Sequence, residues 1–333
     1  MVRKSIQGKN VLVTGADGFI GSHLVEKFVE HGANIRALAL YNSFNNRGWL
    51  EDVQCLNEIE VVCGDIRDPD FTRKISRDMD LIVHLAALIA IPYSYVAPSS
   101  YVHTNVVGTM NVIQAALENN VERILHTSTS EVYGTANYVP IDELHPMQPQ
   151  SPYSASKIAA DAFAESFYRC FDLPLTIVRP FNTYGPRQSA RAVIPTVITR
   201  ILTGDEEIIL GNIHPTRDFS YVEDTCNAFL ELAGCDEAIG TVVNVGSNRE
   251  ISIYDLVMLI KEIMKSDAVI KTEDQRIRPE KSEVERLRCD HSRLVKLTNI
   301  QPGISLREGL TRTIDWFSDP GNLKKYKADI YNV

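Results

Sequence analysis

The sequence has little of what would place a protein at a membrane, in an oxidising compartment or on a nucleic acid. Its six cysteines form no C-x-x-C pair and lie mostly in apolar or helical contexts, so we expect reduced thiols in a cytoplasmic protein. Acidic residues outnumber Lys and Arg by 43 to 34, which argues against nucleic acid or an anionic membrane as a partner. The longest apolar stretch, residues 81–91, contains His84 and is too short to span a bilayer. The basic N-terminus has only a short apolar run before Thr14, so we expect no signal peptide.

Seven short apolar runs alternate with segments of helical spacing. The runs are residues 11–13, 35–40, 59–63, 81–85, 124–126, 175–178 and 242–245. Short apolar runs bounded by turn residues are typical of buried strands in a parallel sheet. The alternation predicts a Rossmann-type doubly wound α/β fold. The large domain would cover residues 1–182, with a return segment at about 216–250.

The composition changes after Pro180, which indicates a smaller and mostly helical second lobe. Residues 183–215 hold several Arg and Pro residues and a helical run that starts at Val193. From Ser252 onward the pattern is mostly helical and opens with a capping-box-like start. We predict a substrate lobe made of residues 183–215 and 251–333, with a ligand cleft between it and the large domain.

A glycine-rich turn with the spacing G-x-x-G-x-x-G follows the first predicted strand. Gly15 allows a tight turn, Gly18 lets a pyrophosphate approach the backbone, and Gly21 lets the next helix pack closely on the strand. A glycine pattern alone is a weak signal. Its place between a strand and a helix predicts a dinucleotide site.

The end of the second predicted strand bears on the choice between NAD and NADP. An acid is expected there for the adenosine ribose hydroxyls of NAD, but Ala39 stands where we place it. Arg36 and Arg47 could serve a 2′-phosphate, although solvated surface arginines explain both more simply. NAD is therefore the predicted cofactor and NADP the alternative.

Tyr153 and Lys157 lie one turn apart in the helical stretch that begins at Ser151. An ammonium beside a phenol favours the phenolate, which would lower the pKa of Tyr153 toward the range of a general base. By itself such a pair is more often an accident of the surface. Here the polar sequence TSTSE, residues 127–131, follows a predicted strand between the glycine loop and the pair.

This set of motifs resembles the extended short-chain dehydrogenase/reductase superfamily, and within it the nucleotide-sugar epimerases and dehydratases. Matching segments also occur at residues 64–66, 84–87, 105–109, 180–187, 217–224 and 278–279. The resemblance implies a tightly held and recycled NAD(P). At the cofactor it places Gly15, Asp17, Gly18, Phe19, Ile20, Gly21, Asp65, Ile66, Leu85, Ala86, Ala87, Asn105, Thr127, Pro180 and the pair Tyr153 and Lys157.

The resemblance also implies a first step common to the family. Thr129 would hydrogen-bond the sugar 4-hydroxyl and Tyr153 would take its proton while hydride passes from C4 to the nicotinamide. In a dehydratase Glu131 would then remove the C5 proton, and Ser130 would relay or position a proton, because a serine hydroxyl is too weak an acid to act alone. A 4-epimerase needs no such carboxylate, whereas UDP-glucuronate decarboxylases also carry Ser-Glu here. The alternative is that both residues merely satisfy loop backbone groups.

Residues 88–95 and 154–157 look like those of 4,6-dehydratases in legionaminic-acid pathways, which act on nucleotide-activated N-acetylglucosamine. Ile89, Ile91 and Tyr93 would suit an acetamido group, although a buried helix start explains them nearly as well. We therefore expect a 4,6-dehydratase acting on UDP- or GDP-N-acetylglucosamine. The alternatives are a 4-epimerase, a UDP-glucuronate decarboxylase and a catalytically silent dinucleotide sensor.

A sugar nucleotide bound to an acidic protein needs local cations at its diphosphate. The residues expected at the substrate are Ser94, Asn182, Arg187, Arg191, Arg217 and Arg278. Arg191 is equally well explained as a solvated arginine at a helix start. No residue is assigned to a metal. By resemblance, helices around residues 105–120 and 152–170 would form a four-helix interface in a homodimer.

Overall fold

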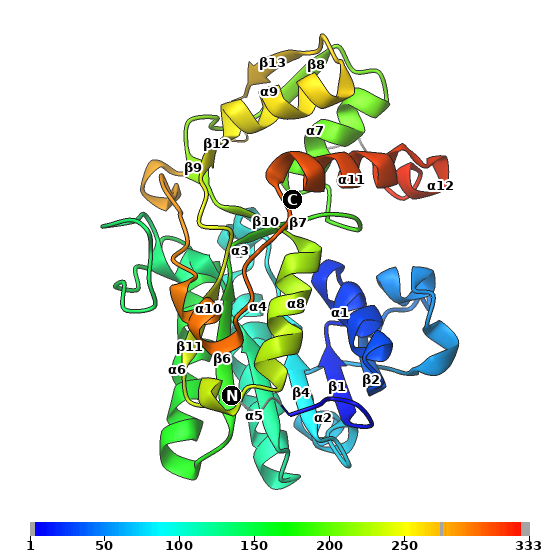
Figure 1. The fold of residues 1–333 in the computed structure, drawn as a ribbon, viewed down its shortest axis with the longest axis vertical. Coiled ribbons are helices and arrows are strands. Elements are labelled where there is room, and N and C mark those ends of the chain that lie inside the picture. Colours follow the sequence, from blue (N-terminus) through cyan, green and yellow to red (C-terminus); the bar gives the residue numbers. More distant parts are fainter. Residues whose placement is uncertain (1–3, 274–275, 277, 328–333) are drawn as a thin grey trace.

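A seven-stranded sheet forms the centre of the protein in the computed structural model, which describes residues 4–273, 276 and 278–327 (Figure 1). The strand order is β3-β2-β1-β4-β5-β6-β11, and all neighbours are parallel. The strands are β1 (Asn10–Thr14), β2 (Asn34–Leu40), β3 (Glu60–Gly64), β4 (Leu81–His84), β5 (Arg123–Thr127), β6 (Leu175–Pro180) and β11 (Val242–Val245). Each predicted run overlaps one of these strands to within two residues at either end, and the predicted Rossmann-type fold is confirmed.

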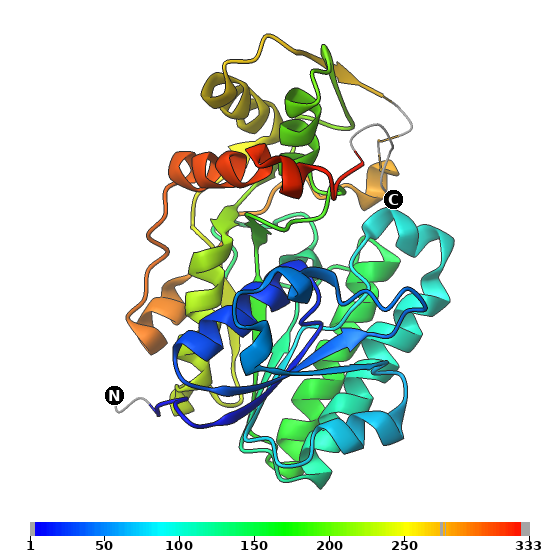
Figure 2. The same ribbon diagram turned by 90° about the vertical axis from the view of Figure 1, so that its right-hand side faces the viewer.

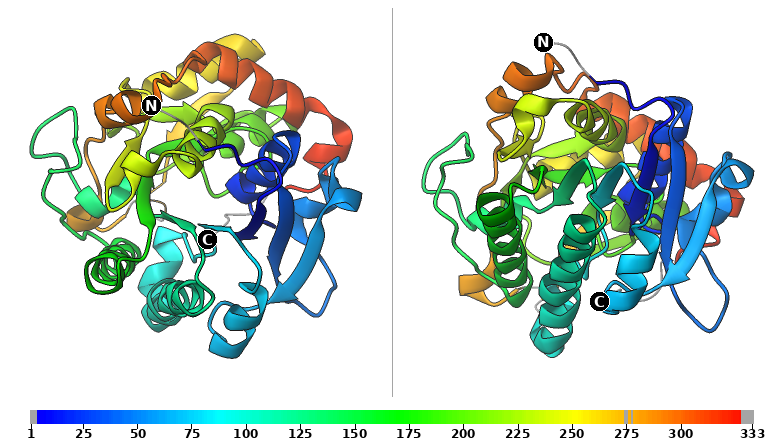
Figure 3. Two further views of the ribbon diagram at one scale, coloured as in Figure 1. Left: turned by 60° about the horizontal axis from the view of Figure 1, so that its bottom comes forward. Right: turned by 90° about the horizontal axis from the view of Figure 1, so that it is seen from below.

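Helices cover both faces of this sheet, as Figure 3 shows. One face carries α2 (Pro69–Ile75), α5 (Gly108–Glu118) and α6 (Pro152–Phe171), and the other carries α1 (Phe19–Glu30) and α8 (Val222–Ala233). Successive side chains of β1 point to opposite faces of the sheet, and both faces are apolar there. Leu12 packs in the core beneath α5 and α6, whereas Val11 and Val13 pack in the core beneath α1 and α8.

The start of α6 is fixed by a capping box. Ser151 Oγ accepts from the backbone N–H of Ser154 at 3.1 Å, and Ser154 Oγ accepts from the backbone N–H of Ser151 at 3.0 Å. Pro152 occupies the first helical position, where its missing N–H is not needed. These local signals place Tyr153 in the first turn of the helix.

A helical lobe lies at the carboxyl ends of the sheet strands (Figures 1 and 2). Its helices α7 (Val193–Leu202), α9 (Ile253–Met264) and α11 (Leu306–Ser318) pack on one another. Three two-stranded pairs complete this end of the molecule: β8 (Glu207–Leu210) with β13 (Val269–Thr272), β7 (Asn182–Tyr184) with β10 (Phe219–Tyr221), and β9 (Thr216–Arg217) with β12 (Ile251–Ser252).

Part of the segment predicted as the lobe 251–333 packs with the sheet domain. Leu287 and Cys289 share a core with Tyr133 and Phe181. Helix α10 (Ser292–Thr298) packs against α8 and β11, and its Leu294 is buried in the same core as Val243. This segment therefore belongs with the sheet, because an apolar side chain of α10 completes the core beneath the last strand.

The remaining short helices are α3 (Ile91–Val96), α4 (Pro98–Tyr101) and α12 (Pro320–Leu323), and a π-helical segment, Val102–Val107, leads into α5. None of the helices in the described ranges is long and apolar enough to cross a bilayer.

Candidate active site

A cavity of about 980 Å³ lies at the carboxyl ends of the sheet strands, with the helical lobe on its other side. Six strand ends contribute to its lining: Gly15 after β1, Leu40 of β2, Gly64 of β3, Leu85 after β4, Thr127 of β5 and Pro180 of β6. From the helical lobe, α7 contributes Thr196 and Arg200. From β1 the chain adds β2 and β3 on one side of the sheet and then continues with β4 on the other side. Such a switch point in a doubly wound sheet leaves a crevice for a ligand.

The glycine loop shapes one end of this cavity. Gly15 has φ +68°, and a Cβ on it would lie 2.8 Å from the backbone nitrogen of Ala86. A Cβ on Gly21 would lie 2.1 Å from the carbonyl oxygen of Gly15, so the loop and helix could not pack as they do. Helix α1 begins after Gly18 without a side-chain cap, which leaves its first N–H groups facing the loop. The loop therefore fits a pyrophosphate at the start of α1.

Most residues expected at the cofactor line the cavity. They are Gly15, Asp17, Gly18, Phe19, Ile20, Gly21, Asp65, Ile66, Leu85, Ala86, Ala87, Thr127, Tyr153 and Pro180. Asn105 and Lys157 lie behind the wall instead. The Asn105 amide bonds the N–H and the C=O of Leu88, at 2.8 and 2.9 Å, and so fixes the wall. Lys157 Nζ donates to the carbonyl oxygen of Thr127 at 2.7 Å.

The end of β2 offers the cavity no acid. Ala39 is fully buried in the core and does not line the cavity. Neither arginine considered for a 2′-phosphate lines it. Arg36 is engaged elsewhere, with Nε donating to Glu60 at 2.7 Å and Nη1 donating to the carbonyl oxygen of Ile75 at 2.8 Å.

Thr129 and Tyr153 meet at the centre of the cavity. Tyr153 is only 7% exposed and its hydroxyl shares a hydrogen bond with Thr129. Thr129 caps a 3₁₀ turn, Ser130–Tyr133, and its Oγ1 accepts from the backbone N–H of Glu131 at 3.2 Å. The Thr129 hydroxyl, just after β5, thus lies beside the Tyr153 phenol. A substrate hydroxyl that contacts both groups would need this arrangement.

Burial dominates the electrostatics of Tyr153 and Lys157. It raises the pKa of Tyr153, the hydrogen bond with Thr129 lowers it, and the Glu131 carboxylate raises it further. Burial lowers the pKa of Lys157 to about 8, and the charge of Asp161 counteracts that fall. In the chain by itself the pKa of Tyr153 therefore lies above its usual value, because burial outweighs the hydrogen bond with Thr129, and the lowering expected from Lys157 is not seen.

Asp161 lies one turn beyond Lys157 on α6 and belongs to a buried polar network. Its Oδ2 accepts from Ser128 Oγ at 2.7 Å and from Arg179 Nη2 at 3.0 Å. Its Oδ1 lies 3.1 Å from His126 Nε2. Burial opposes the ionised form, but these hydrogen-bonded and charged partners lower the pKa of Asp161. An ionised carboxylate at this place favours the protonated form of Lys157.

Ser130 and Glu131 both line the cavity, and the carboxylate is the more available of the two. Ser130 is 3% exposed. Within the described ranges, no hydrogen bond or ion pair holds the Glu131 carboxylate, whereas its backbone N–H donates to Thr129 and its carbonyl oxygen accepts from Gly134. Its charge acts on Tyr153 and also counteracts the effect of burial, which lowers the pKa of Arg217. The Glu131 carboxylate therefore acts electrostatically on both the phenol of Tyr153 and the guanidinium of Arg217.

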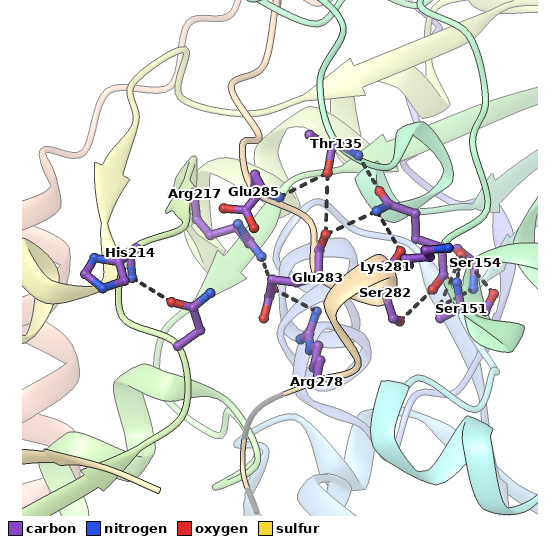
Figure 4. Close-up of polar contacts among 12 residues, drawn as sticks. Thr135, Ser151, Ser154, His214, Arg217, Arg278, Lys281, Ser282, Glu283 and Glu285 are labelled. Atoms are coloured by element: carbon purple, nitrogen blue, oxygen red, sulfur yellow. Dashed lines mark hydrogen bonds and ion pairs between the residues drawn. The ribbon is translucent and has the colours of Figure 1, made fainter. Parts of the chain in front are cut away.

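Arg217 and Arg278 converge on the carboxylate of Glu283 (Figure 4). Oε1 of Glu283 lies 3.2 Å from Arg217 Nη2 and 3.8 Å from Arg278 Nη1, and all three residues line the cavity. The Glu283 carbonyl oxygen accepts from Gln150 Nε2 at 3.1 Å, which fixes this segment across the cavity. Sequence reasoning missed Glu283. Nothing in the sequence separates it from neighbouring acids such as Glu280 and Glu285, and only the fold brings it to Arg217.

The remaining substrate assignments divide into two groups. Asn182 and Arg191 line the cavity. Ser94 and Arg187 do not, and both side chains have partners elsewhere. Ser94 is fully buried and its Oγ donates to the carbonyl oxygen of Ile91 at 2.7 Å. The Arg187 guanidinium pairs with Glu26 of α1, at 2.8 and 3.0 Å, and so ties the β7 end to the large domain.

Comparison with known proteins agrees with this geometry. A family model described as GDP-mannose 4,6 dehydratase matches residues 12–313. A dTDP-D-glucose 4,6-dehydratase from Homo sapiens is 32% identical, over 93% of this chain and 90% of that protein. A putative UDP-glucose 4-epimerase from Methanocaldococcus jannaschii is also 32% identical, over 93% of this chain and 98% of that protein.

The solved structures similar to this chain also include both dehydratases and epimerases. A dTDP-glucose 4,6-dehydratase from Streptomyces venezuelae, solved with NAD bound, has a TM-score of 0.86 at 29% identity and covers 93% of this chain and 97% of its own. A UDP-N-acetylglucosamine 4-epimerase from Methanobrevibacter ruminantium has a TM-score of 0.85 at 31% identity, covering 93% and 98%. Dehydratases and epimerases thus resemble this chain to the same degree.

Proposed function

Because the chain belongs to the NAD-dependent epimerase/dehydratase family of extended short-chain dehydrogenases/reductases, we propose that it is a nucleotide-sugar 4,6-dehydratase. The Glu131 carboxylate carries this proposal. It lines the cavity beside Tyr153, and no ion pair within the described residues occupies it. An epimerase acts at C4 alone and removes no proton from C5, so it has no use for this carboxylate.

The cofactor we propose is NAD, supported by the pyrophosphate-shaped glycine loop and by the NAD-bound dehydratase relative. When bound, NAD supplies the acceptor for the C4 hydrogen as hydride and afterwards the donor of the same hydride to C6. The cofactor is therefore recycled, and the net reaction is the loss of one water molecule from the sugar.

The side chains of the chain move the protons. Thr129 orients the sugar 4-hydroxyl and Tyr153 accepts its proton as C4 becomes a ketone. Glu131 removes the C5 proton, which the ketone has made acidic, and the C6 hydroxyl leaves with one proton as water. A second proton returns to C5 when C6 is reduced, so both residues regain their starting states. Ser130 relays or positions the departing proton, and Lys157 provides positive charge behind Tyr153.

For the substrate we propose UDP- or GDP-N-acetylglucosamine, within a legionaminic-acid type of pathway. Ile89, Ile91 and Tyr93 line the cavity and supply an apolar wall for the acetamido methyl group. Arg217 and Arg278 are positioned for the diphosphate, which needs charged partners when it leaves water. We further propose a cytoplasmic homodimer through α5 and α6. Phe163 and Phe171 of α6, 40% and 55% exposed, support such an interface.

The test is to incubate the purified protein with UDP-, GDP- and dTDP-activated sugars and to measure the mass of the product. Loss of one water supports dehydration. An unchanged mass with altered stereochemistry supports a 4-epimerase, and loss of carbon dioxide supports a UDP-glucuronate decarboxylase. A protein that binds NAD and changes no sugar would be a dinucleotide sensor.

The variant Glu131→Gln separates the two halves of the proposed reaction. We expect substrate still to reduce the bound cofactor, seen as absorbance at the wavelength of the reduced nicotinamide, while water loss falls by about 10²- to 10⁴-fold. Ser130→Ala is the matched control in the same turn and should retain more of the activity. Dehydration at an undiminished rate in Glu131→Gln would remove the carboxylate from the mechanism.

A 4-epimerase is the second candidate, and one observation favours it. The N-acetylglucosamine epimerase relative is 31% identical, as similar to this chain as the dehydratases are. In that case Glu131→Gln would leave turnover nearly unchanged, because the reaction would end at C4.

A further inference from the structure

A carboxylate lies at the end of β2 although β2 itself provides none. In a dinucleotide fold with its pyrophosphate at the start of α1, the adenosine ribose lies over the end of the second strand, where an acid accepts its hydroxyls. Ala39 is buried, and Leu40, the last residue of β2, is apolar. Asp17, within the glycine loop, fills this place. Its Oδ2 accepts from the backbone N–H of Leu40 at 3.1 Å, and both residues line the cavity.

The backbone of Asp17 is held from a second side. Its carbonyl oxygen accepts from the N–H of Trp49 at 3.0 Å, in the segment that follows β2. Gly48 makes this approach possible, because a Cβ there would lie 2.4 Å from the same oxygen, at a φ of +57°. Trp49 in turn packs edge-on against Trp316 of α11, with ring centroids 5.6 Å apart. The carboxylate is therefore fixed in position before any ligand binds.

The charges nearest this place do not suit a 2′-phosphate. Arg36 is bonded to Glu60 and to backbone carbonyls, and it does not line the cavity. Arg67 lines the cavity, but its guanidinium pairs with Asp65. Asp17 is partly buried, so a phosphate dianion beside its carboxylate would meet poorly screened repulsion. Burial also raises the pKa of Asp17, whereas the backbone hydrogen bond from Leu40 lowers it.

We infer that Asp17 accepts the adenosine ribose hydroxyls of the cofactor and makes this chain select NAD over NADP. The inference rests on the proposed function insofar as it assumes a dinucleotide in the cavity. It moves the selecting acid from the end of β2, where sequence reasoning looked for it, to the glycine loop. Leu38 and Leu40 then cover the apolar part of the adenosine site.

The test is calorimetric titration of NAD, NADP and 2′-deoxy-NAD into the chain freed of bound nucleotide. We expect the wild type to bind NAD at least about 30-fold more tightly than NADP. Asp17→Asn should bind NAD about 10- to 100-fold more weakly, the range for a lost hydrogen bond to a charged group, and its preference over NADP should fall toward unity. The asparagine keeps an oxygen that can accept from the Leu40 N–H, so the loop is expected to retain its conformation.

Asp52→Asn is the matched control, because Asp52 lies in the segment that follows β2, pairs with Lys325 and does not line the cavity. We expect it to keep the preference for NAD. The 2′-deoxy compound adds a test that needs no variant of the loop: it should bind the wild type more weakly than NAD does, and Asp17→Asn should not distinguish the two.

The outcomes that overturn the inference differ from those that overturn the proposed function. An unchanged NAD preference in Asp17→Asn, or a wild type that prefers NADP, contradicts the role of Asp17 and leaves the dehydratase intact. A wild type that binds no dinucleotide contradicts both.

Discussion

The two ends of the cavity are formed by different kinds of chemical groups. At the cofactor end the backbone makes the site: the glycine loop, the start of α1 and the strand ends leave a cradle that an added Cβ at Gly15 or Gly21 would fill. At the substrate end charged side chains make it. Arg217 and Arg278 come from distant segments, and both pair with an acid, Glu283.

This difference has a physical consequence for binding. Backbone N–H groups at a helix start need no rearrangement to receive a phosphate. A guanidinium already paired with a carboxylate must exchange that partner for the incoming anion, and the exchange offsets part of the new interaction. We therefore expect tight cofactor retention and a weaker, exchangeable substrate site within one cavity.

The largest effect is expected where the two ends meet, at Tyr153. Tyr153→Phe removes the proton acceptor and should lower the rate of cofactor reduction by substrate by at least about 10³-fold, within the range of general acid–base catalysis. NAD binding should stay within about twofold, because the backbone cradle is untouched. Single-turnover absorbance gives the rate and calorimetry gives the affinity. A wild-type reduction rate in this variant would contradict the role of the phenol.

Lys157 should give the next largest effect, and a pH dependence of defined sign. Its pKa of about 8 means that the ammonium is lost as the pH rises above that value. If its charge supports the Tyr153 phenolate, single-turnover rates decline on the alkaline side. In Lys157→Met the rate should be about 10²-fold lower at neutral pH, and it should rise with pH throughout, because only the raised pKa of Tyr153 then governs it.

Protein stability provides the control for Lys157. The folded pKa, about 8, lies below the usual 10.5, so the unfolded chain binds more protons between these values and the free energy of unfolding rises with pH across that window. Lys157→Met should lose this rise. If activity still declines at alkaline pH in Lys157→Met, a group other than Lys157 causes the decline.

A substrate-end effect of intermediate size is expected from Glu283→Gln. The change removes a negative charge that competes with the diphosphate for Arg217 and Arg278, so UDP or GDP should bind about 3- to 10-fold more tightly, with NAD affinity unchanged. Glu285→Gln is the matched control two residues away, because the fold directs the Glu283 carboxylate, not that of Glu285, to the two arginines (Figure 4). Weaker nucleotide binding in Glu283→Gln would mean that the acid orients the arginines rather than competing for them.

The difference between an end formed by backbone groups and an end formed by side chains also determines what could be predicted from the sequence. The sheet and the glycine loop follow from patterns local to one strand, turn and helix, because parallel strand ends must gather at one edge, whereas the role expected of Thr129 came from the family resemblance. Glu283 could not be found in this way, since it acts only through a contact 66 residues away with Arg217. The resemblance placed Asp17 at the cofactor but not at the end of β2: the sheet pattern locates that end, and only the folded loop brings Asp17 to it.

Arg187 is the opposite case, and we expect it to give the smallest effect on ligands. Its place beside the β7 motif made it a diphosphate candidate, yet its guanidinium bonds Glu26 of α1 and lies outside the cavity lining. Arg187→Gln should change nucleotide affinity by less than about twofold and lower the free energy of unfolding by about 2 kcal/mol, through loss of charged hydrogen bonds. Arg217→Gln should do the reverse, weakening nucleotide binding with a smaller change in stability. Calorimetry and denaturant unfolding of the two variants side by side would show which arginine holds the ligand and which holds the fold; equal losses of affinity would place Arg187 back at the diphosphate.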